Sequence, residues 1–125
     1  MSKIHVVAAI IKKKSLFFIA QRNKKKHLGL KWEFPGGKVN FGETLEQSLT
    51  REINEELNIL ICIQKKIAER QYKDNKINIH LHYFLCSYDN SKFASSEHEN
   101  IAWVKKNELK LYDFVEGDKS IFSLL

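Results

Sequence analysis

The segment from Thr44 to Leu57 has the clearest helical pattern in the chain and limits what the rest can fold into. Its apolar residues recur at every fourth position, as Leu45, Leu49, Ile53 and Leu57. This spacing is typical of a helix that buries one face. Thr44 and Gln47 match a capping box, and Asn58 tolerates the left-handed backbone of a helix end. We therefore predict one amphipathic helix over 44–57, packed against a separate apolar layer.

The segments on both sides of this helix have strand patterns. They are the apolar or alternating runs Ile4–Ile11, Leu16–Arg22, Trp32–Phe34, Ile77–Cys86 and Ile101–Val104, with an irregular run over Ile59–Tyr72. Turns are predicted at Lys12–Ser15 and Pro35–Gly37, a polar loop at Ser87–Asn100, and a terminal helix at Gly117–Leu125. Strands around a central helix, with another helix closing the chain, predict an α/β sandwich built on a mixed sheet.

The length of 125 residues fits a single domain over 1–125 with enough chain for a core. Cys62 and Cys86 lie in apolar runs and are too few for a disulfide framework, so we expect buried thiols in a reducing cytoplasm. No apolar run reaches the length of a membrane span, and Met1–Ile4 leads into a strand without a signal-peptide core. We expect a cytoplasmic protein with no membrane partner.

The net charge of +6 comes with lysines in short clusters at predicted turns. Nucleic-acid readers usually align basic residues on one surface and use Arg for base contacts. We interpret the scattered lysines as a solvated surface, although a positive field also attracts polyphosphates. The sequence offers no aromatic platform for stacked bases, so we expect no nucleic-acid partner.

Three glutamates of the predicted helix, Glu52, Glu55 and Glu56, fall within roughly a 100° arc beside its apolar stripe. Like charges at these spacings repel one another. A hard divalent cation turns that repulsion into attraction, and Mg²⁺ takes oxygen ligands and brings phosphates with it. Arg51 is placed to hold the carboxylates in position. A solvated acidic face is the alternative, but the adjacent glycine-rich segment and the Arg argue against it.

These glutamates belong to a longer pattern over 37–59. The pattern resembles the Nudix box, G-x5-E-x7-R-E-U-x-E-E-x-G-U, where U is a bulky aliphatic residue. The matching residues are Gly37, Glu43, Arg51, Glu52, Ile53, Glu55, Glu56 and Ile59. Asn58 replaces the last glycine, and Asn is the next residue to adopt that backbone geometry. Resemblance to the Nudix hydrolase family implies the Nudix fold, an α/β/α sandwich around a mixed β-sheet.

The resemblance continues outside the box and covers nearly the whole chain. Val6–Ile11, Ala20–Arg22, Trp32–Gly37 and Tyr112–Asp118 are similar to the MutT branch and to the NudG-type CTP pyrophosphohydrolases. This likeness implies a nucleoside triphosphate substrate and a Mg²⁺ cofactor, with Mn²⁺ as a substitute. We expect the enzyme to act as a monomer.

The resemblance also implies residue roles. The implied metal ligands are the Gly36 carbonyl and the carboxylates of Glu52, Glu55, Glu56 and Glu97. The implied catalytic residues are Glu52, Glu55, Glu97 and Arg51. Relatives carry a glutamate six residues before a tryptophan near the C-terminus, and Trp103 places Glu97 there. Glu97 is the expected extra ligand or the base that activates water, with Glu55 as the alternative base. Because Glu99 is close by, an ordinary loop acid is the other interpretation of Glu97.

The implied nucleotide pocket has seven residues. They are Arg22, His27, Glu33, Phe34, Pro35, Gly36 and Asp118. Arg22 has donors for a phosphate or a base carbonyl, or it pairs with a nearby acid. His27 is a lone loop histidine, a weaker candidate because such residues are more often exposed than bound to anything. An ionised Asp118 only accepts hydrogen bonds, so it favours an amino or imino donor on the base.

His80 and His82 alternate along one face of the predicted strand 77–86. Imidazoles are good metal ligands, but a site needs a third partner, and the sequence shows none beside them. We therefore interpret both residues as surface or pocket-wall residues.

The expected reaction is hydrolysis of a nucleoside triphosphate to the monophosphate and pyrophosphate. The leading substrate is 8-oxo-dGTP, which would make the enzyme a nucleotide-pool sanitiser in DNA repair. CTP or a modified dCTP is the alternative. A nucleotide-binding regulator without activity is more distant, because that role goes with decay of the box, whose acids and Arg are all present.

Overall fold

The first strand, β1 (Ile4–Lys13), organises the sheet of the computed structural model, which describes residues 3–89, 92–95 and 97–125. It pairs antiparallel with β4 (Gly36–Lys38) and parallel with β6 (Asn78–Tyr88). Its last two residues form a hairpin with β2 (Leu16–Arg22). The combination of parallel and antiparallel partners on one strand makes the sheet mixed, as predicted.

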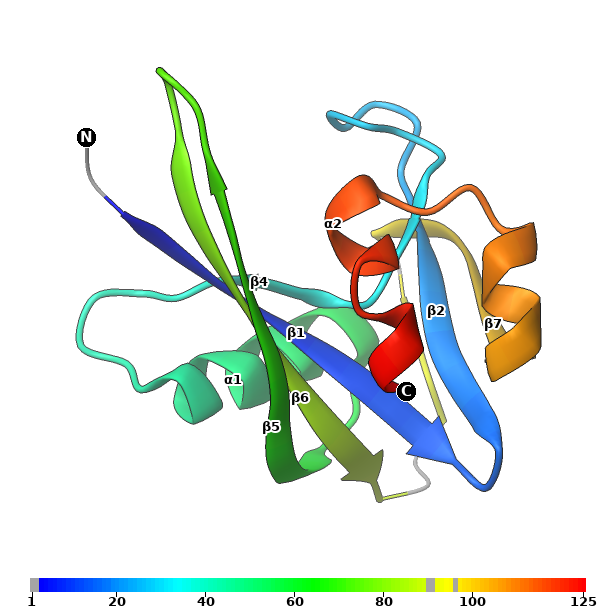
Figure 1. The fold of residues 1–125 in the computed structure, drawn as a ribbon. Helices are drawn as coiled ribbons and strands as arrows, with labels where there is room; N and C mark the ends of the chain where they lie inside the picture. Colours follow the sequence, from blue (N-terminus) through cyan, green and yellow to red (C-terminus); the bar gives the residue numbers. More distant parts are fainter. Residues whose placement is uncertain (1–2, 90–91, 96) are drawn as a thin grey trace.

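The remaining strands extend this sheet at both sides (Figure 1). β5 (Ile61–Lys73) pairs antiparallel with β6, with register shifts near Ile63 and Lys66 that explain its irregular apolar pattern. β2 carries β3 (Trp32–Glu33) on one edge and β7 (His98–Lys105) on the other.

The helix α1 (Leu45–Leu57) forms where its pattern predicted it. Thr44 Oγ1 accepts a hydrogen bond from the Gln47 N–H, and the Gln47 side chain accepts one from the Thr44 N–H, both at 3.0 Å. Asn58 ends the helix in the left-handed conformation, with a φ of 57°. The helix covers one face of the sheet (Figure 1). The apolar residues it buries there are Leu49, Ile53 and Leu57.

The C-terminal segment covers the opposite face through η1 (Lys106–Leu111), α2 (Glu116–Lys119) and η2 (Phe122–Leu124). Leu109, Phe114 and Ile121 are fully buried there against side chains of β1 and β2. The α/β/α sandwich is therefore confirmed. The predicted helix over 117–125 was too long. The helix ends at Lys119, because the Ser120 N–H donates a hydrogen bond to the carbonyl of Gly117, three residues earlier, as in a tight turn.

Two further predictions were wrong. Pro35–Gly37 is not a simple turn, because Gly36 and Gly37 pair with β1 as strand β4. Cys62 is exposed, because the alternation of side chains along β5 turns it away from the face that α1 covers, where Ile61 and Ile63 pack, whereas Cys86 is buried. Burial raises the pKa of the Cys86 thiol to about 12.

The predicted polar loop over 87–100 is shorter than expected, because β6 extends to Tyr88 and β7 begins at His98. Residues 90, 91 and 96 of that loop, like residues 1 and 2 at the N-terminus, lie outside the described part. Phe93 stacks on Phe18 with ring centroids 4.5 Å apart, and its edge meets Trp103 at 5.6 Å. The loop therefore carries an apolar contact that fixes its middle on the sheet.

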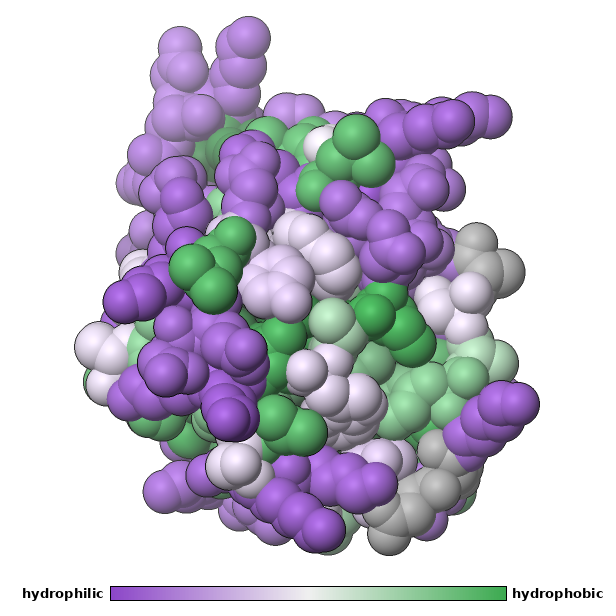
Figure 2. Space-filling model, turned by 90° about the vertical axis from the view of Figure 1, so that its right-hand side faces the viewer, coloured by the Kyte–Doolittle hydropathy of each residue, from purple (hydrophilic) through white to green (hydrophobic). Residues whose placement is uncertain are grey.

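Figure 2 shows the molecule from the right-hand side of Figure 1. Hydrophilic residues lie around much of the margin of this face and apolar residues gather near its middle, so the hydrophilic residues form no single stripe here. Among the described residues, no helix is long and apolar enough to cross a membrane.

Candidate functional site

The glycine pair of β4 lets this strand lie unusually close to its neighbours. A Cβ atom on Gly36 would overlap the backbone carbonyl of Val7 in β1, and one on Gly37 would overlap the carboxylate of Glu52 in α1. The glycines are therefore required for close approach rather than for a positive φ. As a result, the Glu52 carboxylate lies directly on the backbone of β4.

Arg51 binds the acidic side chains around this contact. Its guanidinium donates to Glu43 Oε2 at 2.7 Å, to Glu52 Oε1 at 3.0 Å and to Glu55 Oε2 at 3.2 Å. It also donates to the Lys38 carbonyl at 3.2 Å, which ties the helix to the end of β4. These bonds, led by that with Glu43, raise the pKa of Arg51. Arg51 therefore contacts the three carboxylates of Glu43, Glu52 and Glu55 at once.

Glu56 is the most unusual acid of the helix. Its Oε2 atom is buried and has no hydrogen-bond partner among the described residues. Burial, and then the nearby charges of Glu52, Glu33 and Glu97, raise the pKa of Glu56 to about 8. Four carboxylates thus share one region, and one of them is buried with an oxygen that has no donor. An acidic cluster of this kind fits a hard divalent cation, whose charge would offset the repulsion among the carboxylates and the cost of burying the charge of Glu56.

Arg22 and His98 flank Glu33 at the edge of this cluster. Arg22 Nη1 lies 2.8 Å from Glu33 Oε1, and His98 Nε2 lies 3.5 Å from Glu33 Oε2. Burial opposes ionisation of Glu33, but the hydrogen bonds from His98 and Arg22 outweigh it and lower the pKa of that carboxyl. No sequence pattern selected His98, because its partner Glu33 lies on β3, far away along the chain.

Asp118 is buried beneath the β3–β4 segment. Its Oδ2 atom accepts from the Phe34 N–H at 2.9 Å, and its Oδ1 atom accepts from the Tyr83 hydroxyl at 2.7 Å. Burial raises the pKa of Asp118 to about 7, although both hydrogen bonds oppose that shift. Glu33 and Arg22 also act on this carboxyl electrostatically, so Asp118 belongs to the same region as the acidic cluster.

The other expected pocket residues are arranged less uniformly. The Phe34 ring is buried in the core against Phe114, with centroids 5.2 Å apart. Only the backbone of Phe34 is therefore left to contact a nucleotide. Pro35 is buried, and its carbonyl accepts from the Ala9 N–H at 2.8 Å. His27 is exposed, and its backbone carbonyl accepts from Arg22 Nε at 2.9 Å.

The two candidate bases, Glu97 and Glu55, make different contacts, and Glu97 also differs from the nearby Glu99. Glu97 is exposed and lies close enough to Glu56 to raise its pKa. Glu99 instead accepts a hydrogen bond from the Lys24 N–H at 3.1 Å. Glu55 bonds to Arg51, and its side chain is 60% exposed. Glu97 is therefore an acid linked to the cluster, while Glu99 is occupied elsewhere.

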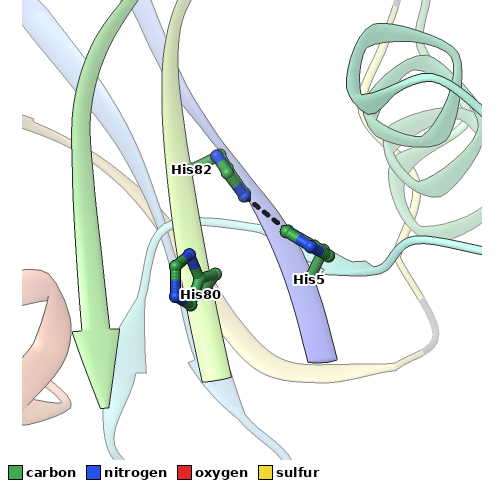
Figure 3. A group of neighbouring side chains, drawn as sticks. All are labelled: His5, His80 and His82. Carbon is green, nitrogen blue, oxygen red and sulfur yellow. Dashed lines mark hydrogen bonds between the residues drawn. The ribbon is translucent and has the colours of Figure 1, made fainter. Parts of the chain in front are cut away.

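The interpretation of His80 and His82 as residues without a third partner was wrong. His5 of β1 lies beside both, and the three imidazoles each offer a nitrogen within 4.8 Å of the others (Figure 3). The parallel pairing of β1 with β6 brings His5 opposite His80. A pairing between strands so distant in sequence leaves no local signal, which is why the third histidine was missed.

The comparisons with known proteins agree with this geometry. The whole chain, residues 1–125, matches the family model of the NUDIX domain. The CTP pyrophosphohydrolase of Escherichia coli K12 is 33% identical over 118 residues, which cover 94% of this chain and 87% of that protein. The 8-oxo-dGTP diphosphatase of Buchnera aphidicola subsp. Schizaphis graminum is 34% identical over 121 residues, covering 97% and 92%.

A solved structure of a similar protein has the same fold. The solution structure of the E. coli ORF135 protein is similar with a TM-score of 0.86 and 31% identity, and the match covers 99% of this chain and 89% of that one. Fold, box residues and relatives thus define the class of enzyme. The chain belongs to the Nudix hydrolase family, and its relatives are named as diphosphatases and pyrophosphohydrolases of nucleotides.

Proposed function

We propose that the protein hydrolyses a nucleoside triphosphate to the monophosphate and pyrophosphate with the help of Mg²⁺, and that 8-oxo-dGTP is its main substrate. The observation that carries the proposal is the carboxylate cluster around the unpartnered Oε2 atom of Glu56. Cations that suit such all-oxygen donor sets are Mg²⁺ and Mn²⁺. The names of the relatives support a nucleotide substrate.

The residues that would hold the cation are the carboxylates of Glu52, Glu55, Glu56 and Glu97 and the carbonyl of Gly36. When bound, Mg²⁺ neutralises charge on the phosphate oxygens and orients the phosphate chain. The contact of Gly37 with Glu52 and the bonds of Arg51 keep the ligands in place before substrate arrives. Preorganised ligands need little rearrangement during the reaction.

The chemical step is a displacement at phosphorus. A bond forms between a water oxygen and phosphorus, the bond from phosphorus to the bridging oxygen breaks, and the water proton passes to a carboxylate. Glu97 is the proposed base, because it is exposed yet within the electrostatic range of Glu56. Glu55 is the alternative base, although its hydrogen bond to Arg51 favours a supporting role.

The nucleotide would lie near Arg22, Glu33 and Asp118, which influence one another electrostatically. When Asp118 is ionised, each of its oxygens accepts one hydrogen bond and keeps a further lone pair for a donor on the base. The imino and amino groups of 8-oxoguanine are such donors. The amino group of cytosine is another, so this carboxylate also supports CTP or a modified dCTP as the second candidate substrate.

A panel of nucleoside triphosphates assayed for pyrophosphate release tests both candidates. We expect release that depends on Mg²⁺ and has its highest kcat/KM with 8-oxo-dGTP. Glu52→Gln is the matched control, because it keeps the shape of the side chain and removes the charge. Release without added divalent cation, or equal release by Glu52→Gln, would contradict the reaction. A kcat/KM that is highest with CTP would replace only the substrate.

A further inference from the structure

The histidine cluster of His5, His80 and His82 lies on β1 and β6, on the sheet face that α1 covers in part (Figure 3). His5 and His80 are paired across the two parallel strands, and His82 follows two residues after His80 on the same face. His5 Nδ1 and His82 Nε2 face one another at 2.9 Å, and their rings are stacked with centroids 5.1 Å apart. The third ring, that of His80, lies 5.6 Å from the His5 ring.

We propose that His5, His80 and His82 form a second metal site, separate from the carboxylate cluster and selective for a transition-metal ion such as Zn²⁺. The imidazole nitrogens lie within 4.8 Å of one another. Two nitrogens on a tetrahedral Zn²⁺ ion, each about 2.0–2.1 Å from it, are separated by roughly 3.3 Å. Small side-chain rotations are therefore enough to bring the three nitrogens to the separation that a tetrahedral ion requires.

The chemistry of the donors selects the ion. Imidazole nitrogens suit Zn²⁺, Cu²⁺ and Ni²⁺, whereas Mg²⁺ prefers oxygen ligands. The cluster and the acidic site would thus take different cations from the same solution. Three histidines also leave a fourth position open to water or to another small ligand, as in zinc sites of this ligand number.

The protonation states of the cluster favour ligation. Burial, and then the positive charge of Lys3, lower the pKa of His80. Burial, and then Lys66, lower the pKa of His82. Both rings are thus neutral near pH 7, which is the form that binds a metal. The Nε2 atom of His80 is buried without a hydrogen-bond partner among the described residues, so a metal could satisfy a nitrogen that the protein leaves unpaired.

Glu69 supplies the surroundings that a ligating histidine usually has. Its Oε1 atom lies 3.1 Å from His82 Nδ1, although the two atoms are not aligned for a hydrogen bond. A small rotation of the ring would align them while His82 Nε2 turns toward the ion. A carboxylate behind a ligating imidazole fixes its tautomer and increases its basicity. Glu69 also pairs with Lys66 at 2.6 Å, so its charge partly offsets the two lysines near the site.

A plain structural role is the competing explanation, in which the His5–His82 hydrogen bond and ring stacking only join β1 to β6. Binding of Co²⁺ to the purified protein, without a polyhistidine tag and in millimolar Mg²⁺, distinguishes this structural role from the proposed metal site. We expect one tightly bound Co²⁺ with the strong visible absorption of a four-coordinate nitrogen site. Zn²⁺ should displace it and should raise the Tm, because a bound ion links two strands only in the folded state.

Matched variants locate the ion. His5→Gln and His80→Gln should each weaken Co²⁺ binding at least tenfold, whereas His27→Gln, at an exposed loop histidine, should leave it unchanged. His82 is almost fully buried, so the two partly exposed positions serve as the primary test in case His82→Gln does not fold. The Glu52→Gln variant should bind Co²⁺ as the unchanged protein does.

Three results would overturn the site. One is the absence of tight Co²⁺ binding in folded protein. Another is a spectrum unchanged in both histidine variants. The third is a weak, six-coordinate spectrum that Glu52→Gln removes, because the ion would then occupy the carboxylate cluster. The pyrophosphate assay is independent of all three, so failure of this site would leave the proposed hydrolysis untouched.

Discussion

The carboxylate of Glu52 lies directly against the α-carbon of Gly37, with no room between them for a methyl group. Glu52 comes from α1 and Gly37 from β4, so this contact joins the helix to the sheet at the acidic cluster. The contact sets how far the helix carboxylates reach over β4. The glycine of the box is therefore a residue that positions the Glu52 carboxylate.

Gly37→Ala should lower kcat by at least tenfold, because the new Cβ atom displaces the Glu52 carboxylate. Steady-state kinetics with saturating Mg²⁺ measure the loss, and thermal unfolding checks that the protein folds. Gly42→Ala is the control, since a Cβ atom there meets nothing within 4 Å but the φ of +87° is strained. We expect Gly42→Ala to cost about 1 kcal/mol of stability and to keep its kcat. Equal kcat values for the two variants would refute this role of Gly37.

Glu56→Gln should lower turnover by orders of magnitude while the fold survives. The charge of Glu56 is costly in the free protein, because burial and the charges of Glu52, Glu33 and Glu97 all oppose it. Removing that charge should leave the free energy of unfolding in the absence of metal equal or slightly higher. Chemical denaturation without divalent cations, and kcat at saturating Mg²⁺, measure the two effects. A variant with nearly the original kcat would remove Glu56 from the metal site.

The features that the sequence predicted correctly are local. The capping box of Thr44 and Gln47 and the left-handed Asn58 depend on residues a few positions apart, and each formed as expected. The same holds for Arg51, whose carboxylate partners Glu52 and Glu55 lie within one turn of the helix. Short-range spacing thus determined the acidic face of α1.

The features that the sequence did not predict depend on long-range pairing. His5 and His82 are 77 residues apart and meet only because β1 and β6 pair in parallel. Likewise, His98 reaches Glu33 only because β7 and β3 both pair with β2. The strand conformation of Gly36 was missed because a Pro-Gly-Gly sequence predicts a turn. The sequence does not show that β1 lies so close to Gly36 that only a glycine fits there.

Asp118 should make the protein less stable as the pH rises. Burial raises the pKa of Asp118 to about 7 in the folded state from 3.8, so the folded protein holds a proton that the unfolded chain releases over that range. Its contribution to stability is therefore present below about pH 4 and is lost as the pH rises toward 7. Asn does not titrate, so the Asp118→Asn variant does not lose stability in this way. Its free energy of unfolding, minus that of the unchanged protein, should therefore increase by on the order of 4 kcal/mol between pH 4 and 8.

Denaturant unfolding at several pH values measures this difference. Asn should fit the site, since its oxygen can accept from the Phe34 N–H while its amide donates to the Tyr83 hydroxyl oxygen. Asp113→Asn is the control, because the Lys31 hydrogen bond lowers the pKa of that exposed carboxyl. The stability difference between Asp113→Asn and the unchanged protein should therefore be constant between pH 4 and 8 and should shrink only below about pH 4. A pH-independent difference for Asp118→Asn would show that Asp118 is ionised throughout.

Glu97→Gln should lower kcat by about two orders of magnitude or more with little change in KM, because proton transfer to a base occurs only in the transition state. Glu97 is exposed, yet its charge acts on Glu56, which places it at the edge of the acidic cluster. Glu99→Gln is the matched control two residues away. Glu99 is bound to the Lys24 N–H, and a glutamine oxygen would keep that bond, so its kcat should stay close to the original value. Equal losses in the two variants, or a larger loss for Glu99→Gln, would exclude Glu97 as the base and leave Glu55 as the next candidate.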